Sequence, residues 1–215
     1  YEENFKKICQ ELSKKFTNGK TAIKVHFGEE GNTTYLNPEL VKTLAKNINN
    51  PYLIECNVLY KGKRTYAKDH IELAKQHGFT FAPIIIADGE KGEDCLEIEI
   101  NKKHFKTIKI GKELKNFKNL VVFSHFTGHI ATGFGGALKN LGMGLGSRAG
   151  KLAMHCKTSI SINQEKCTAC GLCIENCPAD AISYVNKKAF INQEKCIKCA
   201  RCIAVCPQKA PQIPW

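Results

Sequence analysis

Hydrophobic and polar residues are arranged along most of the chain in a way that predicts helices and strands in turn. Apolar residues at helical spacing predict helices at residues 2–16, 38–47 and 65–77. Short apolar or alternating runs predict strands at residues 21–27, 52–56, 83–87 and 120–123. Because strands alternate with helices, we expect an α/β fold with a mostly parallel sheet covered by helices.

Local signals add detail to this pattern. Asn37 precedes Pro38 and is a suitable N-cap for the second helix. Residues 95–100 and 105–110 alternate between apolar and polar positions, which predicts a hairpin with one face in solvent.

Residues 128–150 depart from the alternation, because eight of them are glycine. Ordering so many glycines is costly, but glycine lets the backbone come close to another group. Large apolar residues such as Phe134 and Leu138 lie among them, whereas flexible linkers are polar. We therefore expect an ordered binding loop here rather than a linker.

Cysteine spacing dominates the chain after residue 166. The run Cys-x-x-Cys-x-x-Cys-x-x-x-Cys-Pro occurs at residues 167–178 and again at 196–207. The six residues Ile-Asn-Gln-Glu-Lys-Cys lead into each run, so the segment is an internal repeat. This is the cysteine pattern of bacterial two-cluster ferredoxins.

In such ferredoxins the fourth cysteine of each run binds the cluster of the other run. The expected ligands of the first [4Fe–4S] cluster are Cys167, Cys170, Cys173 and Cys206. The expected ligands of the second are Cys196, Cys199, Cys202 and Cys177. Zinc ribbons use two separated cysteine pairs, and disulfides occur mainly in secreted chains, so both alternatives fit less well.

This assignment divides the chain into an α/β domain at residues 1–158, a small α+β ferredoxin-like module at 159–210 and a truncated tail at 211–215. Both ends look cut. Outside the motif, Cys9, Cys56 and Cys95 have no metal-binding spacing, and we expect them to be reduced and mostly buried.

The formal net charge of +12 makes nucleic acid a partner to consider. However, 29 of the 32 basic residues are lysine and the charges are spread, whereas nucleic-acid contacts favour arginine. No apolar run is long enough to span a membrane. We expect a cytoplasmic protein of an anaerobe that meets a redox partner protein or a small-molecule substrate.

A ligand site is expected where the strand at residues 120–123 ends, because α/β sheets bind ligands beyond the carboxyl ends of their strands. Two histidines and two cations there are candidates for catalysis: His125, His129, Lys139 and Arg148. Candidates for holding a further metal or small-molecule cofactor are Gly135, Gly136, Lys151 and His155, with Cys156 beside them. The two leading histidines fit a structural role equally well.

Several long segments resemble a known family. They are residues 22–29, 124–129, 133–144, 150–151 and 154–155. The similarity is to uncharacterised iron–sulfur-centre proteins grouped as domain of unknown function 362. The resemblance implies a two-cluster module and a site near these segments, but no established reaction.

Three functions fit these patterns. The first is an oxidoreductase of unknown substrate, in which two [4Fe–4S] clusters pass electrons to or from a ligand site in the α/β domain. The second is a non-catalytic electron carrier whose α/β domain docks partners. The third is a protein that handles a metallocofactor. A ligand cavity near His125 would favour the first or third function over the second.

Overall fold

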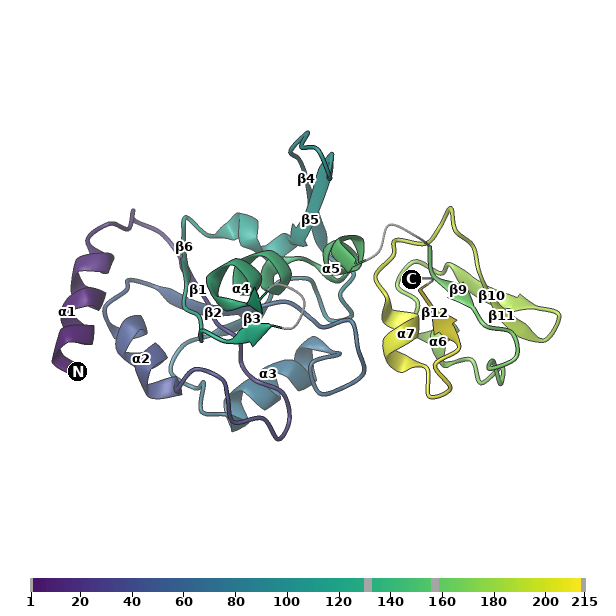
Figure 1. Cartoon of the computed structure of the whole chain (residues 1–215), viewed down its shortest axis with the longest axis horizontal. Helices are drawn as coiled ribbons and strands as arrows, with labels where there is room; N and C mark the ends of the chain where they lie inside the picture. Colours follow the sequence, from purple (N-terminus) through teal and green to yellow (C-terminus); the bar gives the residue numbers. More distant parts are fainter. Residues whose placement is uncertain (1, 130–132, 156–158, 214–215) are drawn as a thin grey trace.

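The computed structural model describes residues 2–129, 133–155 and 159–213 of the 215-residue chain. It shows an elongated molecule with a large N-terminal unit at one end and a smaller C-terminal module at the other (Figure 1).

A four-stranded parallel sheet forms the centre of the large unit. Its strands are β1 (Thr21–Lys24), β2 (Pro51–Glu55), β3 (Ile84–Ile86) and β6 (Asn119–Val122), in the order β3-β2-β1-β6. The α/β prediction with a mostly parallel sheet is therefore confirmed. The first strand is shorter than expected, because its pairing with both neighbours covers only Thr21–Lys24.

Helices cover this sheet on both faces. Helices α1 (Glu2–Ser13), α2 (Pro38–Lys46) and α3 (Ala67–Gln76) contribute to one apolar core with residues of β1 and β2. A second core lies between the sheet, α4 (Gly136–Leu145) and the 3-10 helix η1 (Lys112–Asn116). The expected cap of α2 is present, since Oδ1 of Asn37 accepts a hydrogen bond from the backbone N–H of Glu39 at 2.9 Å.

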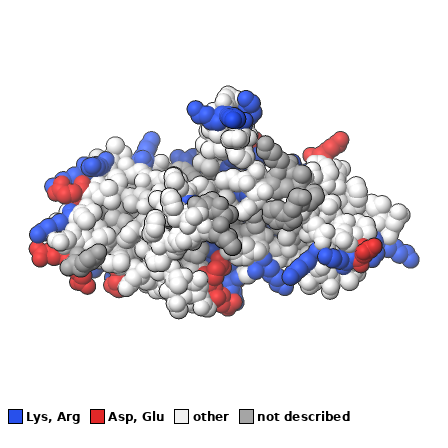
Figure 2. Space-filling view, viewed as in Figure 1, with Lys and Arg blue, Asp and Glu red and all other residues white. Residues whose placement is uncertain are grey.

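The predicted hairpin is also present. Strands β4 (Cys95–Glu99) and β5 (Thr107–Gly111) pair antiparallel and project from the body of the molecule (Figure 1). Basic side chains gather at the tip of this projection, and others lie along the lower edge of the molecule (Figure 2). On this face the positive charge is distributed over both units.

The glycine-rich segment is not the loop that its composition suggested. After the short pair β7 (Gly128–His129) and β8 (Gly133–Phe134), it forms α4 and then α5 (Arg148–His155). Some of these glycines allow close packing of the helices instead. A Cβ atom on Gly150 would lie 2.0 Å from the carbonyl oxygen of Lys109 on the hairpin, so only glycine fits there.

The C-terminal module has its own core. It contains β9 (Ser161–Ile162), α6 (Leu172–Glu175), β10 (Ile182–Val185), β11 (Lys188–Ile191), α7 (Arg201–Val205) and β12 (Pro211–Gln212). Strand β10 pairs with β11, and β9 pairs with β12. Residues 211–212, expected in a tail, are thus part of the module. Leu152 of α5 joins this core and links the module to the large unit.

None of the helices in the described ranges has both the length and the apolar character needed to cross a membrane.

Candidate functional site

A large cavity lies at the carboxyl edge of the sheet. Strands β1 and β6 are neighbours there, although the chain connects β1 to β2 on its other side. Such a switch in strand order opens a crevice in which α/β proteins bind ligands. The cavity, called the sheet-edge cavity below, has a volume of about 620 Å³ and is bordered by Lys24, Glu55 and Ser124.

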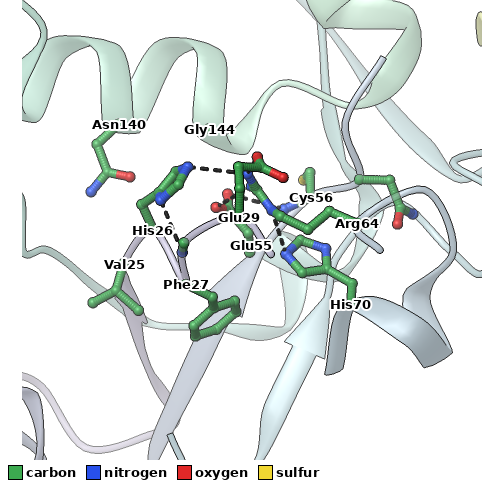
Figure 3. A network of polar contacts seen from close by, with 12 residues as sticks. Val25, His26, Phe27, Glu29, Glu55, Cys56, Arg64, His70, Asn140 and Gly144 are labelled. Carbon is green, nitrogen blue, oxygen red and sulfur yellow. Dashed lines mark hydrogen bonds and ion pairs between the residues drawn. The ribbon is translucent and has the colours of Figure 1, made fainter. Parts of the chain in front are cut away.

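Buried charges form the floor of the sheet-edge cavity. Nζ of Lys24 lies 2.7 Å from Oε1 of Glu55, and Nη2 of Arg64 lies 2.8 Å from Oε2 of the same carboxylate. Arg64 also pairs with Glu29 and lies 3.0 Å from Nε2 of His26 (Figure 3). One carboxylate therefore joins two cations that come from different parts of the chain.

These contacts shift several pKa values. Burial alone would raise the pKa of Glu55, but Lys24 and Arg64 outweigh it and hold the pKa at about 2. Partial burial and the charge of Arg64 lower the pKa of His26 to about 4, although its ring remains exposed on the cavity side. Burial and Arg64 also lower the pKa of His70, whose Nε2 accepts a hydrogen bond from Nε of Arg64 at 2.9 Å. Both histidines are neutral at pH 7.

Helix α4 is fixed over this floor by Asn140. Its Oδ1 accepts a hydrogen bond from Nζ of Lys24 at 2.6 Å, and its Nδ2 donates to Oγ of Ser124 at 3.0 Å. Gly144, one turn further along, leaves room for the lysine. A Cβ atom at this glycine would lie 2.5 Å from Cε of Lys24.

Further cations line the sheet-edge cavity above the floor. Lys151 is buried, and its Nζ donates to the carbonyl of Gly146 at 2.6 Å. Lys139 is exposed and lies one turn from the N-terminus of α4. Among the described residues, no carboxylate oxygen lies within 4 Å of either ammonium group. The cavity therefore carries uncompensated positive charge, which favours an anionic ligand.

Apolar side chains form the remaining walls. Tyr35 and Leu36 line the cavity from the segment after β1, and Leu59 lines it from the segment after β2. Ile203 and Ile213 line it from the C-terminal module. The sheet-edge cavity is thus shared between both units and has the size and mixed lining of a small-molecule site.

Most of the predicted ligand-site residues meet in this cavity. The described residues in its lining include His125, Gly135, Gly136, Lys139, Lys151 and His155. His129 lies on β7 and is not in that lining, so the expectation that both histidines share one pocket is wrong for this residue. Cys156 lies outside the described residues.

Arg148 also lies outside the lining of the sheet-edge cavity. Its backbone N–H donates to Oδ2 of Asp88 at 3.1 Å, and its Nη1 donates to the carbonyls of Thr65 and Lys91. The side chain is buried between the two units, away from the sheet-edge cavity. Its expected place beside His125 is therefore wrong.

The charged floor was not among the sites predicted from the sequence. Lys24 and Glu55 lie at the ends of adjacent strands, within runs that otherwise read as apolar. A charged residue at the end of each of two buried strands is a signal that could have been used, because such charges are rarely buried unless paired.

The eight motif cysteines line two smaller cavities in the module. The first cysteine cavity is bordered by Cys167, Cys170, Cys173 and Cys206. The second cysteine cavity is bordered by Cys177, Cys196, Cys199 and Cys202. Each contains three cysteines of one run and the fourth cysteine of the other, which is the geometry that crossed ligation requires.

The backbone around the two cysteine cavities repeats after 29 residues. Three pairs of equivalent positions have positive φ: Ala169 and Lys198, Gly171 and Ala200, Asp180 and Lys209. Left-handed residues of this kind turn successive N–H groups toward one point and create an anion-binding hollow. Backbone N–H groups also point at the sulfurs, with Ala181 N 3.3 Å from Cys177 Sγ and Ala210 N 3.4 Å from Cys206 Sγ.

All cysteines in the described residues are free thiols. Cys9 and Cys56 are buried as expected, while Cys95 is half-buried. Burial raises the pKa of Cys173, Cys199 and Cys202, so these thiols would be neutral unless a nearby cation favoured the thiolate. Within the described residues, no three His, Cys, Asp or Glu side chains are placed to hold a single metal ion.

Comparison with known proteins supports the resemblance seen in the sequence. A search of curated proteins gave no match. A family model described as Domain of unknown function (DUF362) matches residues 21–204, which include the parallel sheet, most of the lining of the sheet-edge cavity and every motif cysteine except Cys206. Because the match covers most of the chain, this protein belongs to the DUF362 family.

Proposed function

We propose that this protein carries two [4Fe–4S] clusters and transfers electrons between them and an anionic ligand in the sheet-edge cavity. The observation that carries the proposal is the division of eight cysteines into two crossed sets of four, each around its own cavity. The module would then be ferredoxin-like, and the protein would be an oxidoreductase whose substrate is a small anion.

The residues present fit such clusters. The thiolates of a cubane bind different iron atoms and stand further apart than the ligands of one ion, which agrees with the lack of a single-ion site among the described residues. The bound iron would supply the positive charge that favours thiolates at buried cysteines such as Cys199. A bound cluster would accept or release one electron at a time.

The sheet-edge cavity is suitably placed to exchange electrons with the module. Ile203, which lines it, lies in α7 between Cys202 and Cys206, one from each expected ligand set. The ligand would rest with its negative group toward Lys139 and Lys151 and its apolar part against residues such as Leu59. An open cavity of about 620 Å³ favours this function over a carrier whose α/β domain only docks partners.

The cluster part of the proposal is tested by analysis of protein prepared without oxygen. Iron and acid-labile sulfide should each approach roughly eight per chain, as two cubanes require. Dithionite should produce the EPR signals of reduced clusters. Protein that binds zinc but no iron under these conditions would contradict the proposal.

The ligand part is tested with a pair of fluorescent probes that differ in charge. We expect the anion 8-anilinonaphthalene-1-sulfonate to bind the sheet-edge cavity and neutral N-phenyl-1-naphthylamine to bind with less dependence on the lysines. Lys139→Ala and Lys151→Met should each weaken the anionic probe about tenfold, or about 1.4 kcal/mol. Lys42→Ala on α2 is the control and should leave binding of the anionic probe unchanged. Equal binding of the anionic probe by wild type and both cavity variants would contradict an anion site.

A further inference from the structure

Two buried arginines meet where the module contacts the large unit. Arg148 on α5 and Arg201 on α7 are both fully buried. Nη1 of each donates to the same oxygen, the carbonyl of Thr65, at 3.4 Å and 3.1 Å respectively. Two like charges are thus held at hydrogen-bond distance from one peptide oxygen.

The guanidinium groups have too few partners for this position. In the part of the chain that the structure describes, Nε and Nη2 of both arginines have no hydrogen-bond partner, and neither forms an ion pair within 4 Å. Tyr66 stacks on Arg201, with its ring centre 3.9 Å from Cζ, but this contact leaves the N–H edges free. Asp88 binds the backbone N–H of Arg148 rather than its guanidinium.

Uncompensated buried charge is strongly unfavourable, so the pair requires an anion nearby. The second cysteine cavity provides the place for one, since Arg201 lines it together with Cys199 and Cys202. Arg148 lies next to Arg201, because both donate to the carbonyl oxygen of Thr65. A [4Fe–4S] core with four thiolates carries a charge of about −2 when oxidised.

The first cysteine cavity has no arginine in its described lining. The repeat of 29 residues places Leu172 at the position that corresponds to Arg201. Leu172 lines the first cavity and is 38% exposed, and no described residue of that lining is charged. The two halves of the repeat therefore provide an internal comparison, with buried arginines beside the second site, whereas the cation near the first site is the partly exposed Lys188, which donates to the carbonyl of Cys167.

We propose that Arg148 and Arg201 are the counter-charge of the second cluster and raise its reduction potential above that of the first. This inference rests on the proposed function. One-electron reduction adds a negative charge to the cluster, and buried cations stabilise that charge because little water screens it. The α/β domain, through Arg148, thereby tunes the potential of a cluster that the module binds.

The test is an EPR-monitored redox titration of the full chain with dithionite under anaerobic conditions. Wild type should show two midpoints. Two variants should each lower the higher midpoint potential by at least about 59 mV, which corresponds to a tenfold change in the equilibrium constant of a one-electron couple. The variants are Arg201→Leu, which introduces the residue found at the equivalent position of the first half of the repeat, and Arg148→Gln. The lower midpoint should stay unchanged, and Lys42→Gln on α2 should alter neither.

Iron and sulfide analysis before each titration separates the two proposals. Wild type without two clusters would contradict the proposed function itself. Two intact clusters with unchanged midpoints in both arginine variants would overturn the counter-charge role. If Arg148→Gln loses the second cluster, Arg148→Lys, which keeps the positive charge, is measured next. A second cluster that is retained in Arg148→Lys supports the counter-charge role. A second cluster that is lost in both variants overturns it.

Discussion

Lys24 and Glu55 form an ion pair of 2.7 Å in which both side chains are buried. They lie at the carboxyl ends of β1 and β2, which are adjacent in the sheet. Arg64 binds the other oxygen of the same carboxylate. Glu55 therefore neutralises Lys24 and, together with Glu29, Arg64 in the floor of the sheet-edge cavity.

The first prediction concerns the loss of that charge. Glu55→Gln leaves Lys24 and Arg64 buried beside a neutral group, and we expect it to lower the free energy of unfolding by about 3–5 kcal/mol. Denaturant titration followed by circular dichroism measures the change. Glu39→Gln is the matched control, because Glu39 forms an exposed pair with Lys42 and should cost less than about 1 kcal/mol. Equal effects of both variants would contradict the role of the buried pair.

The second prediction concerns acid. The pKa of Glu55 is about 2 in the folded protein against an ordinary value of 4.5, so its stabilising effect is present above pH 4.5 and is lost as the pH falls toward 2. The pKa of His70 lies below its ordinary value of 6.5, so unfolding gains a proton below pH 6.5 and acid destabilises the fold there too.

Thermal melting between pH 7 and pH 3 tests this dependence. We expect wild type to lose stability on acidification, with a steep part below pH 4.5. Glu55→Gln should lack the steep part, because glutamine does not titrate. Burial raises the pKa of Asp88 to about 6, so protonation of Asp88 on acidification stabilises the fold instead. The effect of Glu55 is therefore measured as the difference between the curves of wild type and variant. Parallel curves for the two proteins would contradict the prediction.

The third prediction concerns Gly144. A methyl group there would lie 2.5 Å from Cε and 2.7 Å from Nζ of Lys24, which is held between Glu55 and Asn140. We expect Gly144→Ala to destabilise the protein by about 1–3 kcal/mol through overpacking. Gly142→Ala, on the same helix with open space at its Cβ position, should instead be neutral or slightly stabilising. Denaturant unfolding of the two variants makes the comparison, and a smaller loss for Gly144→Ala would refute it.

The fourth prediction concerns crossed ligation. Cys177 belongs to the first run but lines the second cysteine cavity. Cys177→Ser should therefore damage the cluster held by Cys196, Cys199 and Cys202 and leave the other intact. Iron analysis and EPR of the variant measure this, with Cys95→Ser as a control outside both cavities. Loss of only the cluster bound by the 167–173 cysteines would show that ligation is not crossed.

Much of the fold could be predicted from local pattern. The buried strands, the helices between them and the cap at Asn37 follow from hydrophobic spacing and turn residues, which act over a few positions. The glycine-rich segment could not be read in this way. Gly144 and Gly150 leave room for Lys24 and Lys109, which are distant in sequence, so composition suggested a loop where the chain forms two helices.

The position of the candidate site could be predicted from the sequence, but not all of the residues that form it. His125, Lys139 and Lys151, which the sequence suggested as parts of one site, all line the sheet-edge cavity, and their roles there stay predictions. The ion network of Lys24, Glu55 and Arg64 depends on strand register and on a loop that folds back, neither of which is encoded in spacing. Arg148 was misplaced because its side chain reaches the carbonyl of Thr65, which Arg201 of the C-terminal module also binds.

The repeat of the C-terminal module has a consequence for access by other molecules. Cys170 of the first cavity is exposed to solvent, whereas its repeat equivalent in the second cavity, Cys199, is buried against the large unit. Equivalent cysteines of the repeat therefore have unlike surroundings. In the proposed electron transfer, an external donor or acceptor would meet Cys170 at the surface, whereas Cys199 would exchange electrons through the surrounding protein.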